Sequence, residues 1–315
     1  MVSFLQINLR KSYQANLLAG QAMEKINKTV SLITEPHTVY NKLHGYPGGT
    51  QCIYDSSIPT NSPGPRAAIV HSKDLIITSL QHWCNRDCAV GLINLNGQKT
   101  ILASIYLDIN LPVRQEWLEK LLRMAEVKSY PVIIGMDSNA HSSLFGPDTN
   151  QRGEELENLI LEHTLKVENQ GDIPTFEARR GAAIAQTSID VTLTRGLNRS
   201  VDEWHVNRDY NASDHNNIHF KINADPDSKV KIRPWSKTDW KVFSDHLRKA
   251  DYKTPLTMSM KKLDKIVTHM YKLIDDALDV ACPKIKVSNT TKSGHWATDE
   301  HAKQKQSVSK LYKRA

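Results

Sequence analysis

The pattern that most constrains this chain is a series of short runs of apolar and β-branched residues within residues 1–222. Most runs are bounded by Gly, Pro, Asn or Asp, as β-strands commonly are. Between some of them, apolar residues recur at the three- and four-residue spacing of a helix, as Leu118 and Leu122 do. Many strands with interspersed helices predict α/β layers around extensive sheets. The predicted strands span residues 2–9, 29–36, 67–71, 75–81, 89–96, 99–108, 131–138, 188–194 and 216–222, and the predicted helices span residues 12–28, 112–128 and 154–165.

The character of the sequence changes near residue 222, where a polar, proline-containing stretch typical of a linker begins. Two helical patterns follow it. In the second, Leu263, Met270 and Leu278 share one stripe, and Pro283 ends the pattern. We expect a further helix from Thr298. The predicted parts are a domain over residues 1–222, a linker over 223–238, and a helical extension over 239–315 whose first two helices span 239–249 and 259–282.

The net charge of +7 is unevenly distributed along the chain. Residues 1–222 hold 21 Lys and Arg against 23 Asp and Glu, a net charge of −2, whereas residues 223–315 hold 20 against 11, a net charge of +9. The basic excess therefore belongs to the C-terminal third, and it is no argument for nucleic-acid binding by the first domain. The basic segment fits either a solvated helix or a segment that attracts a nucleic-acid backbone.

Composition also disfavours several classes of protein. No apolar run reaches the roughly 18 residues of a membrane span, and the N-terminus lacks the parts of a secretory signal. The four cysteines form neither a disulfide framework nor a zinc-ligand pattern. We therefore expect a protein of a reducing compartment, nuclear or cytoplasmic, with no membrane partner.

Polar side chains appear where several predicted strands end. The stretch PVIIGMDSNAHSSLFG passes from an apolar strand to Asp137, Asn139 and His141 at every second position. Asn8 lies late in the first strand, and Glu35 comes at the end of the second. Taken singly, each residue fits an ordinary polar turn or a solvated carboxylate. Taken together, they also fit an active site at the carboxyl ends of strands.

Asp190 is harder to attribute to structure alone. The alternation of residues 188–194 places it on the polar face of a strand, and an unpaired buried charge there would be costly. A histidine is a natural partner, because a carboxylate fixes its tautomer and leaves the other ring nitrogen free for proton transfer. His215, which follows Asp214 just before the last strand, is the candidate.

Together these residues suit metal-assisted hydrolysis of a phosphodiester. Glu35 and Asp214 offer hard oxygen ligands, which select Mg²⁺ or Mn²⁺. Asn8 would hold a metal-binding carboxylate or a metal-bound water. Asp137 and Asn139, two residues apart, point to one face. One of them would position the attacking water while the other donates to a non-bridging phosphate oxygen.

Six motifs occur in one order along the chain: QINLR, LITEP, SIYLD, GMDSNAHSSLFG, PTF before TSIDVTLT, and SDHNNI. In order and approximate spacing they resemble the apurinic-type endonuclease domain of non-LTR retrotransposons, within the endonuclease/exonuclease/phosphatase superfamily. The resemblance spans essentially residues 2–222. It implies a four-layer α/β sandwich, two mixed β-sheets face to face with helices outside, followed by a basic helical extension.

The matching motif positions imply roles for eight residues. Tyr106 would lie near the scissile phosphate, although a tyrosine of the core or rim is the alternative at that position. His141 also matches the family pattern, but we interpret it as tethering the loop after its strand. The implied roles are metal binding by Asn8, Glu35 and Asp214, catalytic polar contacts by Asp137, Asn139 and Tyr106, phosphate contact by His215, and orientation of that histidine by Asp190.

The resemblance implies an endonuclease dependent on Mg²⁺ or Mn²⁺ that nicks double-stranded DNA and leaves a 3′-hydroxyl as a primer for retrotransposition. The alternatives are an apurinic/apyrimidinic repair endonuclease of the same superfamily and a non-catalytic nucleic-acid-binding remnant of a retroelement. The basic segment resembles the connector to a reverse transcriptase, which makes the element RNA a candidate partner. We expect a fragment of a longer polyprotein, a truncated genomic copy or a stand-alone nuclease.

Overall fold

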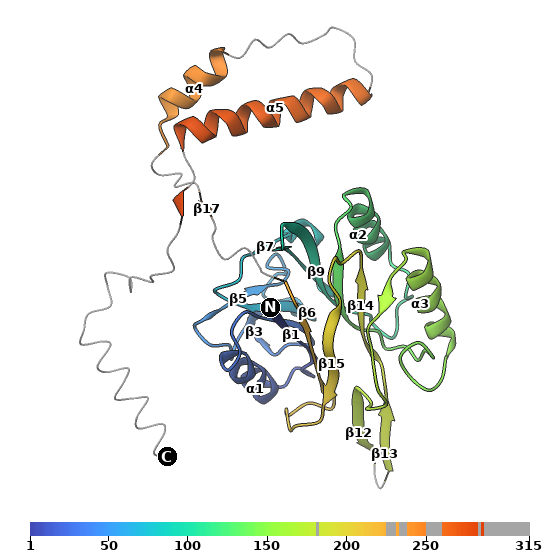
Figure 1. The fold of residues 1–315 in the computed structure, drawn as a ribbon. Coiled ribbons are helices and arrows are strands. Elements are labelled where there is room, and N and C mark those ends of the chain that lie inside the picture. The colour runs from blue at the N-terminus through green and yellow to red at the C-terminus, as the bar shows by residue number, and fades with distance from the viewer. Residues whose placement is uncertain (181–182, 225–230, 233–237, 250–259, 283–284, 287–315) are drawn as a thin grey trace, which may run out of the picture. The chain divides into compact units, whose positions relative to one another are not determined.

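The computed structural model describes residues 1–180, 183–224, 231–232, 238–249, 260–282 and 285–286. The chain divides into two compact units, Met1–Ser228 and Lys229–Ala315. The first unit holds both large sheets (Figure 1). The helix expected from Thr298 lies outside the described residues.

The first sheet has six strands, of which β1 and β2 run parallel and the others pair antiparallel. The alternation of β1 gives each of its faces a different partner. Phe4 points into the core between the two sheets, whereas Leu5 and Ile7 pack on the other side with helix α1 (Tyr13–Glu24). The strand order is β15 (Val201–Asn207), β16 (Asn217–Ile222), β1 (Val2–Asn8), β2 (Thr29–Thr34), β6 (Ala67–Ser72) and β5 (Thr50–Ile53).

The second sheet also has six strands, and β9 and β10 are its parallel pair. Two hairpins accompany the sheets in this unit, and one of them, β12–β13, projects beyond the sheets (Figure 1). The order in the sheet is β11 (Lys166–Val167), β14 (Asp190–Arg195), β10 (Val132–Asp137), β9 (Gln98–Tyr106), β8 (Cys88–Leu95) and β7 (Ile77–Ser79); the hairpins are β12 (Phe176–Arg180) with β13 (Ala183–Thr187), and β3 (Thr38–Val39) with β4 (Lys42–Leu43).

Helices cover the outer faces of both sheets, which confirms the predicted four-layer sandwich with mixed sheets. Helix α1 (Tyr13–Glu24) packs on the first sheet, and α2 (Glu116–Val127) and α3 (Gln151–Glu162) pack on the second. Ser12 caps α1 by accepting a hydrogen bond from the Ala15 amide. A short 3-10 helix, Gln81–Trp83, precedes β8.

In its described residues, the second unit contains two helices, α4 (Trp240–Lys249) and α5 (Met260–Ala281), and one short strand pair, β17 (Lys231–Ile232) with β18 (Ile285–Lys286). Both helices agree with the predicted patterns. Along the predicted stripe of α5, Leu278 is buried, but Met270 is exposed. Among the described residues, no helix has the length and apolar character that crossing a bilayer requires.

The two sheets pack closely through small and polar residues as well as apolar ones. The Thr192 hydroxyl donates to Gln6 (2.8 Å) and accepts from the Trp204 indole (2.9 Å), which satisfies these buried polar groups. Gly135, in the middle of β10, marks a close approach of the two sheets. A Cβ added at this position would lie 2.9 Å from Leu32 and 3.1 Å from Gln6.

We therefore expect Gly135→Ala to lower the free energy of unfolding by about 1–3 kcal/mol, because the added methyl group overpacks the core between the sheets. Gly48→Ala is the matched control, since its Cβ would meet no atom within 4 Å. That variant should stay within about 0.5 kcal/mol of the wild type. Urea denaturation measures both, and equal stabilities would contradict the proposed packing constraint.

Candidate active site

The eight predicted site residues lie along one edge of the two sheets. Because β1 and β2 are parallel, as are β9 and β10, the carboxyl ends of each pair lie together. Strands β16 and β14 run antiparallel to these pairs and therefore begin at the same edge. Asn8 ends β1, Glu35 follows β2, Tyr106 ends β9, Asp137 ends β10, Asn139 follows it, Asp190 begins β14, and Asp214 and His215 precede β16.

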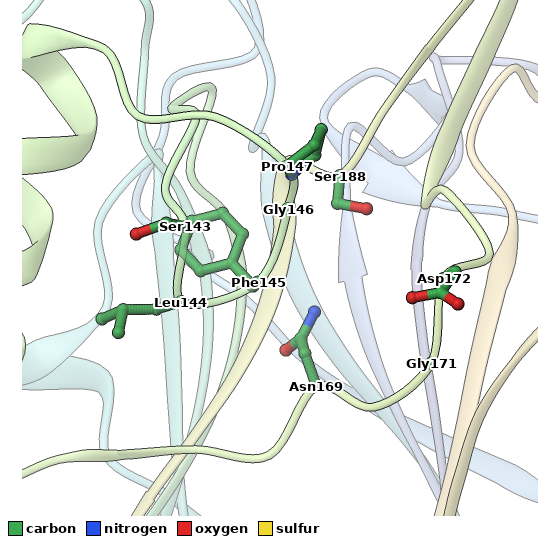
Figure 2. A pocket seen from close by; sticks show the side chains of 9 residues that line it. All are labelled: Ser143, Leu144, Phe145, Gly146, Pro147, Asn169, Gly171, Asp172 and Ser188. Carbon is green, nitrogen blue, oxygen red and sulfur yellow. The ribbon is translucent and has the colours of Figure 1, made fainter.

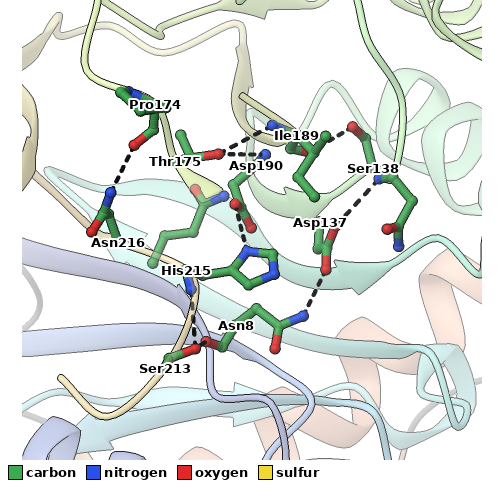
Figure 3. Close-up of polar contacts among 12 residues, drawn as sticks. Asn8, Asp137, Ser138, Pro174, Thr175, Ile189, Asp190, Ser213, His215 and Asn216 are labelled. Carbon is green, nitrogen blue, oxygen red and sulfur yellow. Dashed lines mark hydrogen bonds and ion pairs between the residues drawn. The ribbon is translucent and has the colours of Figure 1, made fainter. Parts of the chain in front are cut away.

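His215 and Asp190 form the predicted pair (Figure 3). The Nδ1 atom of His215 lies 2.8 Å from Oδ2 of Asp190, and both residues are buried. The Thr175 hydroxyl accepts hydrogen bonds from the amides of Ile189 and Asp190, which fixes the start of β14. The Phe176 ring packs edge-on against the imidazole at 5.0 Å. With Nδ1 engaged, Nε2 is the imidazole nitrogen left for a substrate.

Asn8 and Asp137 join the two sheets at this edge (Figure 3). Nδ2 of Asn8 donates to Oδ2 of Asp137 at 2.7 Å, and both side chains are about 2% exposed. The backbone carbonyl of Asn8 accepts from the Ser213 hydroxyl at 2.7 Å, and that same hydroxyl oxygen accepts from the His215 amide at 3.2 Å. These hydrogen bonds place the two predicted pairs, Asn8–Asp137 and Asp190–His215, in one cluster.

The cluster holds more negative than positive charge, which displaces its pKa values. Burial, followed by the nearby Asp190 carboxylate, raises the pKa of Asp137 to about 7. Burial lowers the pKa of His215, but Asp190, Asp137 and Asp214 outweigh it and raise that pKa to about 9. The imidazole of His215 is therefore charged near neutral pH, and Asp137 sits close to its proton-exchange range.

Tyr106 ends the strand beside Asp137 and lies under the guanidinium of Arg66, whose Cζ is 4.6 Å from the ring centroid. Arg66 is held in turn by Asp87 and Asp108, each at 2.6 Å. Burial, followed by Glu35 and Asp137, raises the pKa of Tyr106 to about 12, so its phenol remains a hydrogen-bond donor. Its position at the site edge fits the predicted phosphate contact.

Asn139 has a left-handed backbone, with φ of 47°. Its amide side chain donates to the Leu107 carbonyl at 3.1 Å, and its backbone N–H lies 3.3 Å from Oδ1 of Asp137. It thus lies beside Asp137, while its side-chain nitrogen also supports the neighbouring loop. In this geometry Asn139 both borders the cluster and ties the loops after β9 and β10 together.

His141 makes its hydrogen-bond contacts with residues outside the cluster. Its Nδ1 lies 3.1 Å from the Asp148 carboxylate, and its backbone carbonyl accepts from the Asn150 amide. Helix α3 approaches the same carbonyl so closely that a Cβ on Gly153 would lie 1.7 Å from the oxygen. Gly153 therefore lies within the helix at a close backbone approach and not in the turn before it. These contacts fit the interpretation of His141 as a tether of this loop.

Glu35 and Asp214 lie at the rim, each beside a basic side chain. Nζ of Lys11 is 3.3 Å from Glu35, and Nε of Arg10 is 3.3 Å from Asp214. Within the described part of the chain, the site residues that bring three possible metal-ligand atoms within 4.8 Å are Asp137, Asp190 and His215. Glu35 and Asp214 lie outside that group, although their carboxylates remain partly exposed.

A cavity of about 350 Å³ lies beside the loop after β10 (Figure 2). It is lined by residues 143–147 of that loop, by Asn169, Gly171 and Asp172, and by Ser188. The Asn169 amide donates to the backbone carbonyl of Asp190 at 3.0 Å, which connects one wall of the cavity to strand β14. None of the eight predicted site residues lines this cavity.

Several residues that hold the site have no predicted role. Thr175 fixes Asp190, Arg66 stacks on Tyr106, and Ser213 bridges Asn8 and His215. Thr175 lies in the motif PTF, and Ser213 lies in SDHNNI. Their positions near Asp190 and His215 in these motifs are the sequence signal that could have indicated a role for their hydroxyls. Arg66 had none, because its partners are distant in sequence.

Part of the chain is similar to a known protein family. Residues 100–219 match the sequence model of the family described as Endonuclease-reverse transcriptase. This segment contains six of the eight site residues: Tyr106, Asp137, Asn139, Asp190, Asp214 and His215. The comparison with curated protein sequences gives no match.

Solved structures resemble the chain over its first unit. The endonuclease domain of TRAS1, a telomere-specific non-LTR retrotransposon, is 27% identical with a TM-score of 0.59, covering 71% of this chain and 99% of that one. AP endonuclease LMAP from Leishmania major has a TM-score of 0.54 at 10% identity, covering 70% and 86%. An endonuclease/exonuclease/phosphatase from Bacteroides vulgatus has 0.52 at 14%, covering 70% and 99%. The last two show the fold alone. The chain therefore has the fold of endonuclease/exonuclease/phosphatase proteins, and its residues 100–219 match the Endonuclease-reverse transcriptase family.

Proposed function

We propose that the first unit is a divalent-metal-dependent endonuclease that nicks one strand of duplex DNA and leaves a 3′-hydroxyl usable as a primer. The observation that carries this proposal is the meeting of two buried pairs, Asn8–Asp137 and Asp190–His215, at one edge of the sandwich. Each pair joins a residue of the first sheet to one of the second. Such an arrangement is suited to holding a phosphodiester between the ends of several strands.

The residues fit a hard divalent cation such as Mg²⁺ or Mn²⁺. The proposed ligands, Glu35 and Asp214, offer carboxylate oxygens, which such a cation prefers, and both carboxylates are partly exposed at the rim. Glu35 and Asp214 would bind the ion, and Asn8 would act by holding the Asp137 carboxylate in place. The ion would supply Lewis-acid stabilisation of negative charge on the phosphate.

The protein's own groups divide the remaining work. Asp137 would accept a proton from the attacking water, which suits a carboxylate with a pKa near neutrality. The charged His215, oriented by Asp190, would donate from Nε2 to a non-bridging phosphate oxygen. Tyr106 would donate its phenol hydrogen to the same phosphate, and Asn139 would keep the loop beside Asp137 in position.

The basic excess of residues 223–315 would contribute sequence-independent attraction to nucleic acid, either the DNA target or the element RNA. This contribution is separate from the chemistry, because the site residues lie in the first unit. We propose that residues 239–315 act as a basic helical connector, and that the protein works in the nucleus or cytoplasm.

Replacing His215 or Asp137 by Ala should lower the nicking rate about 10²–10⁴-fold, because each variant loses a group that acts on the phosphate or the water. Duplex binding should change little. Conversion of supercoiled plasmid to the open circle measures the rate, and fluorescence anisotropy measures binding. His141→Ala is the control, and its rate should stay near the wild type because its imidazole contacts Asp148 outside the cluster. Unchanged cleavage by the first two variants would refute the site assignment.

Removing divalent cations should abolish nicking. Treatment with EDTA followed by dialysis should leave the protein folded, and adding Mg²⁺ should restore the rate, because the carboxylates at the edge need a counter-charge to admit a phosphate. Circular dichroism serves as the folding control. Full activity in EDTA would exclude the proposed metal dependence.

A duplex with one abasic site separates the proposal from a repair function. The retroelement type of nuclease should nick an intact duplex at a rate comparable to that for the abasic duplex under the same conditions. Gel analysis of end-labelled duplexes gives both rates and locates the nick. A strong preference for the abasic duplex would instead support a repair endonuclease.

A further inference from the structure

Arg10 and Lys11 follow β1 directly and hold an unusual backbone. Their φ values are 48° and 55°, so two consecutive non-glycine residues are left-handed. Glu35 (44°) and Asn139 (47°) are left-handed at the same edge. Such conformations cost free energy and persist only where surrounding contacts enforce them, most often at functional sites.

The contacts that enforce this backbone come from the site itself. The Arg10 amide donates to Oδ1 of Asn8, and the Lys11 amide donates to the Glu35 carbonyl, both at 2.7 Å. The Ser12 amide donates to the Leu9 carbonyl at 2.8 Å, immediately before α1 begins. Both basic residues are thus attached to the same backbone that presents Asn8 and Glu35.

The two ion pairs at the rim are asymmetric. The side chains of Arg10 and Lys11 are 67% and 64% exposed, whereas those of Asp214 and Glu35 are 19% and 20% exposed. Each pair therefore joins a short, partly buried carboxylate to a long cation whose stem reaches into solvent. The cation can leave with little rearrangement, but the carboxylate stays at the edge.

Because the site is negatively charged, this difference in exposure affects how the edge can bind a DNA strand. Residues 1–222 carry a net charge of −2, and Glu35, Asp137, Asp190 and Asp214 all lie at the edge that a DNA strand would approach. While Arg10 and Lys11 are occupied by carboxylates, they offer little attraction to phosphates. A divalent cation on those carboxylates would add positive charge and remove the partners of both side chains.

We propose that Arg10 and Lys11 are exchangeable counter-ions, which pair with Asp214 and Glu35 in the metal-free protein and with phosphates of the DNA strand once a divalent cation is bound. The proposal rests on the proposed function, since it takes Glu35 and Asp214 as metal ligands. Metal and DNA then bind cooperatively, and each raises the affinity for the other by the same factor.

The test uses the full chain carrying His215→Ala, which prevents cleavage during the measurement. Duplex binding is followed by fluorescence anisotropy over a range of salt concentrations, in Mg²⁺ and in EDTA. In Mg²⁺, the double variant Arg10→Gln/Lys11→Gln should reduce the slope of log affinity against log salt by about 1.8, which corresponds to two lost phosphate contacts. In EDTA, the same substitutions should leave the slope unchanged.

The matched control is Lys73→Gln/Lys99→Gln, which removes two exposed charges from the opposite edge of the sheets. Its slope should not depend on Mg²⁺. The charge-preserving variant Arg10→Lys/Lys11→Arg should restore the wild-type slope in Mg²⁺, and thermal melting reports whether each variant folds. Calorimetry with Mg²⁺ alone should show tighter metal binding by the Arg10→Gln/Lys11→Gln protein, because the competing cations are gone.

Two results would overturn the exchange. An equal loss of slope in Mg²⁺ and in EDTA would make Arg10 and Lys11 plain phosphate contacts, and no loss in Mg²⁺ would exclude phosphate contact. Failure of the proposed function is seen separately, as absence of nicking by the protein with His215 intact. If the protein with His215 intact nicks DNA but either of these two slope results is found, the proposed nuclease function stands and the counter-ion exchange is refuted.

Discussion

The hydrogen bond from Asn8 to Asp137 is the contact on which the candidate site depends. It spans the two sheets at their common edge, with both partners almost fully buried. Through the Asn8 carbonyl and Ser213, the same connection reaches the backbone of His215. Asp137 and Asp190 are register partners within the second sheet, whereas Asn8 and His215 come from the first. A shift of one sheet against the other would therefore separate Asn8 from Asp137 and His215 from Asp190. The close packing at Gly135 opposes such a shift, so the geometry of the site at the edge depends on the packing of the core between the sheets.

Much of this arrangement could be predicted because it follows from strand polarity. Apolar runs identify the buried strands, and a parallel pair brings its carboxyl ends to one edge. Missed strands lack that signal. Two of the four residues of β5 are exposed, the β12–β13 hairpin mixes charged, polar, small and large apolar residues, and β15 carries a register shift between Asp202 and His205 that breaks its period. These strands acquire their conformation from pairing with a neighbour, which a single-sequence pattern does not contain.

Some of the site residues could likewise be predicted from the sequence, and others could not. Asp190 and His215 could be paired from sequence because a strand-borne carboxylate needs a partner and the candidates for that partner are few. Arg66 could not be placed, since it meets Tyr106, Asp87 and Asp108 only after the two sheets are packed. Arg10 could not be placed either, because it is distinguished by a left-handed backbone. No residue type in QINLR predicts such a conformation.

Electrostatics then sets how such a domain can meet a polyanion. A net negative unit with a carboxylate-rich edge gains no affinity from its overall charge, so attraction must arise locally or from the basic C-terminal third. The two sources differ in kind. Charge in the C-terminal segment acts at any metal concentration and falls only with salt. Charge at the edge is available only after the carboxylates of Glu35 and Asp214 have another partner. If Arg10 and Lys11 exchange partners as proposed, binding through the segment can precede metal binding, whereas close approach of a phosphate to Asp137 and His215 requires it.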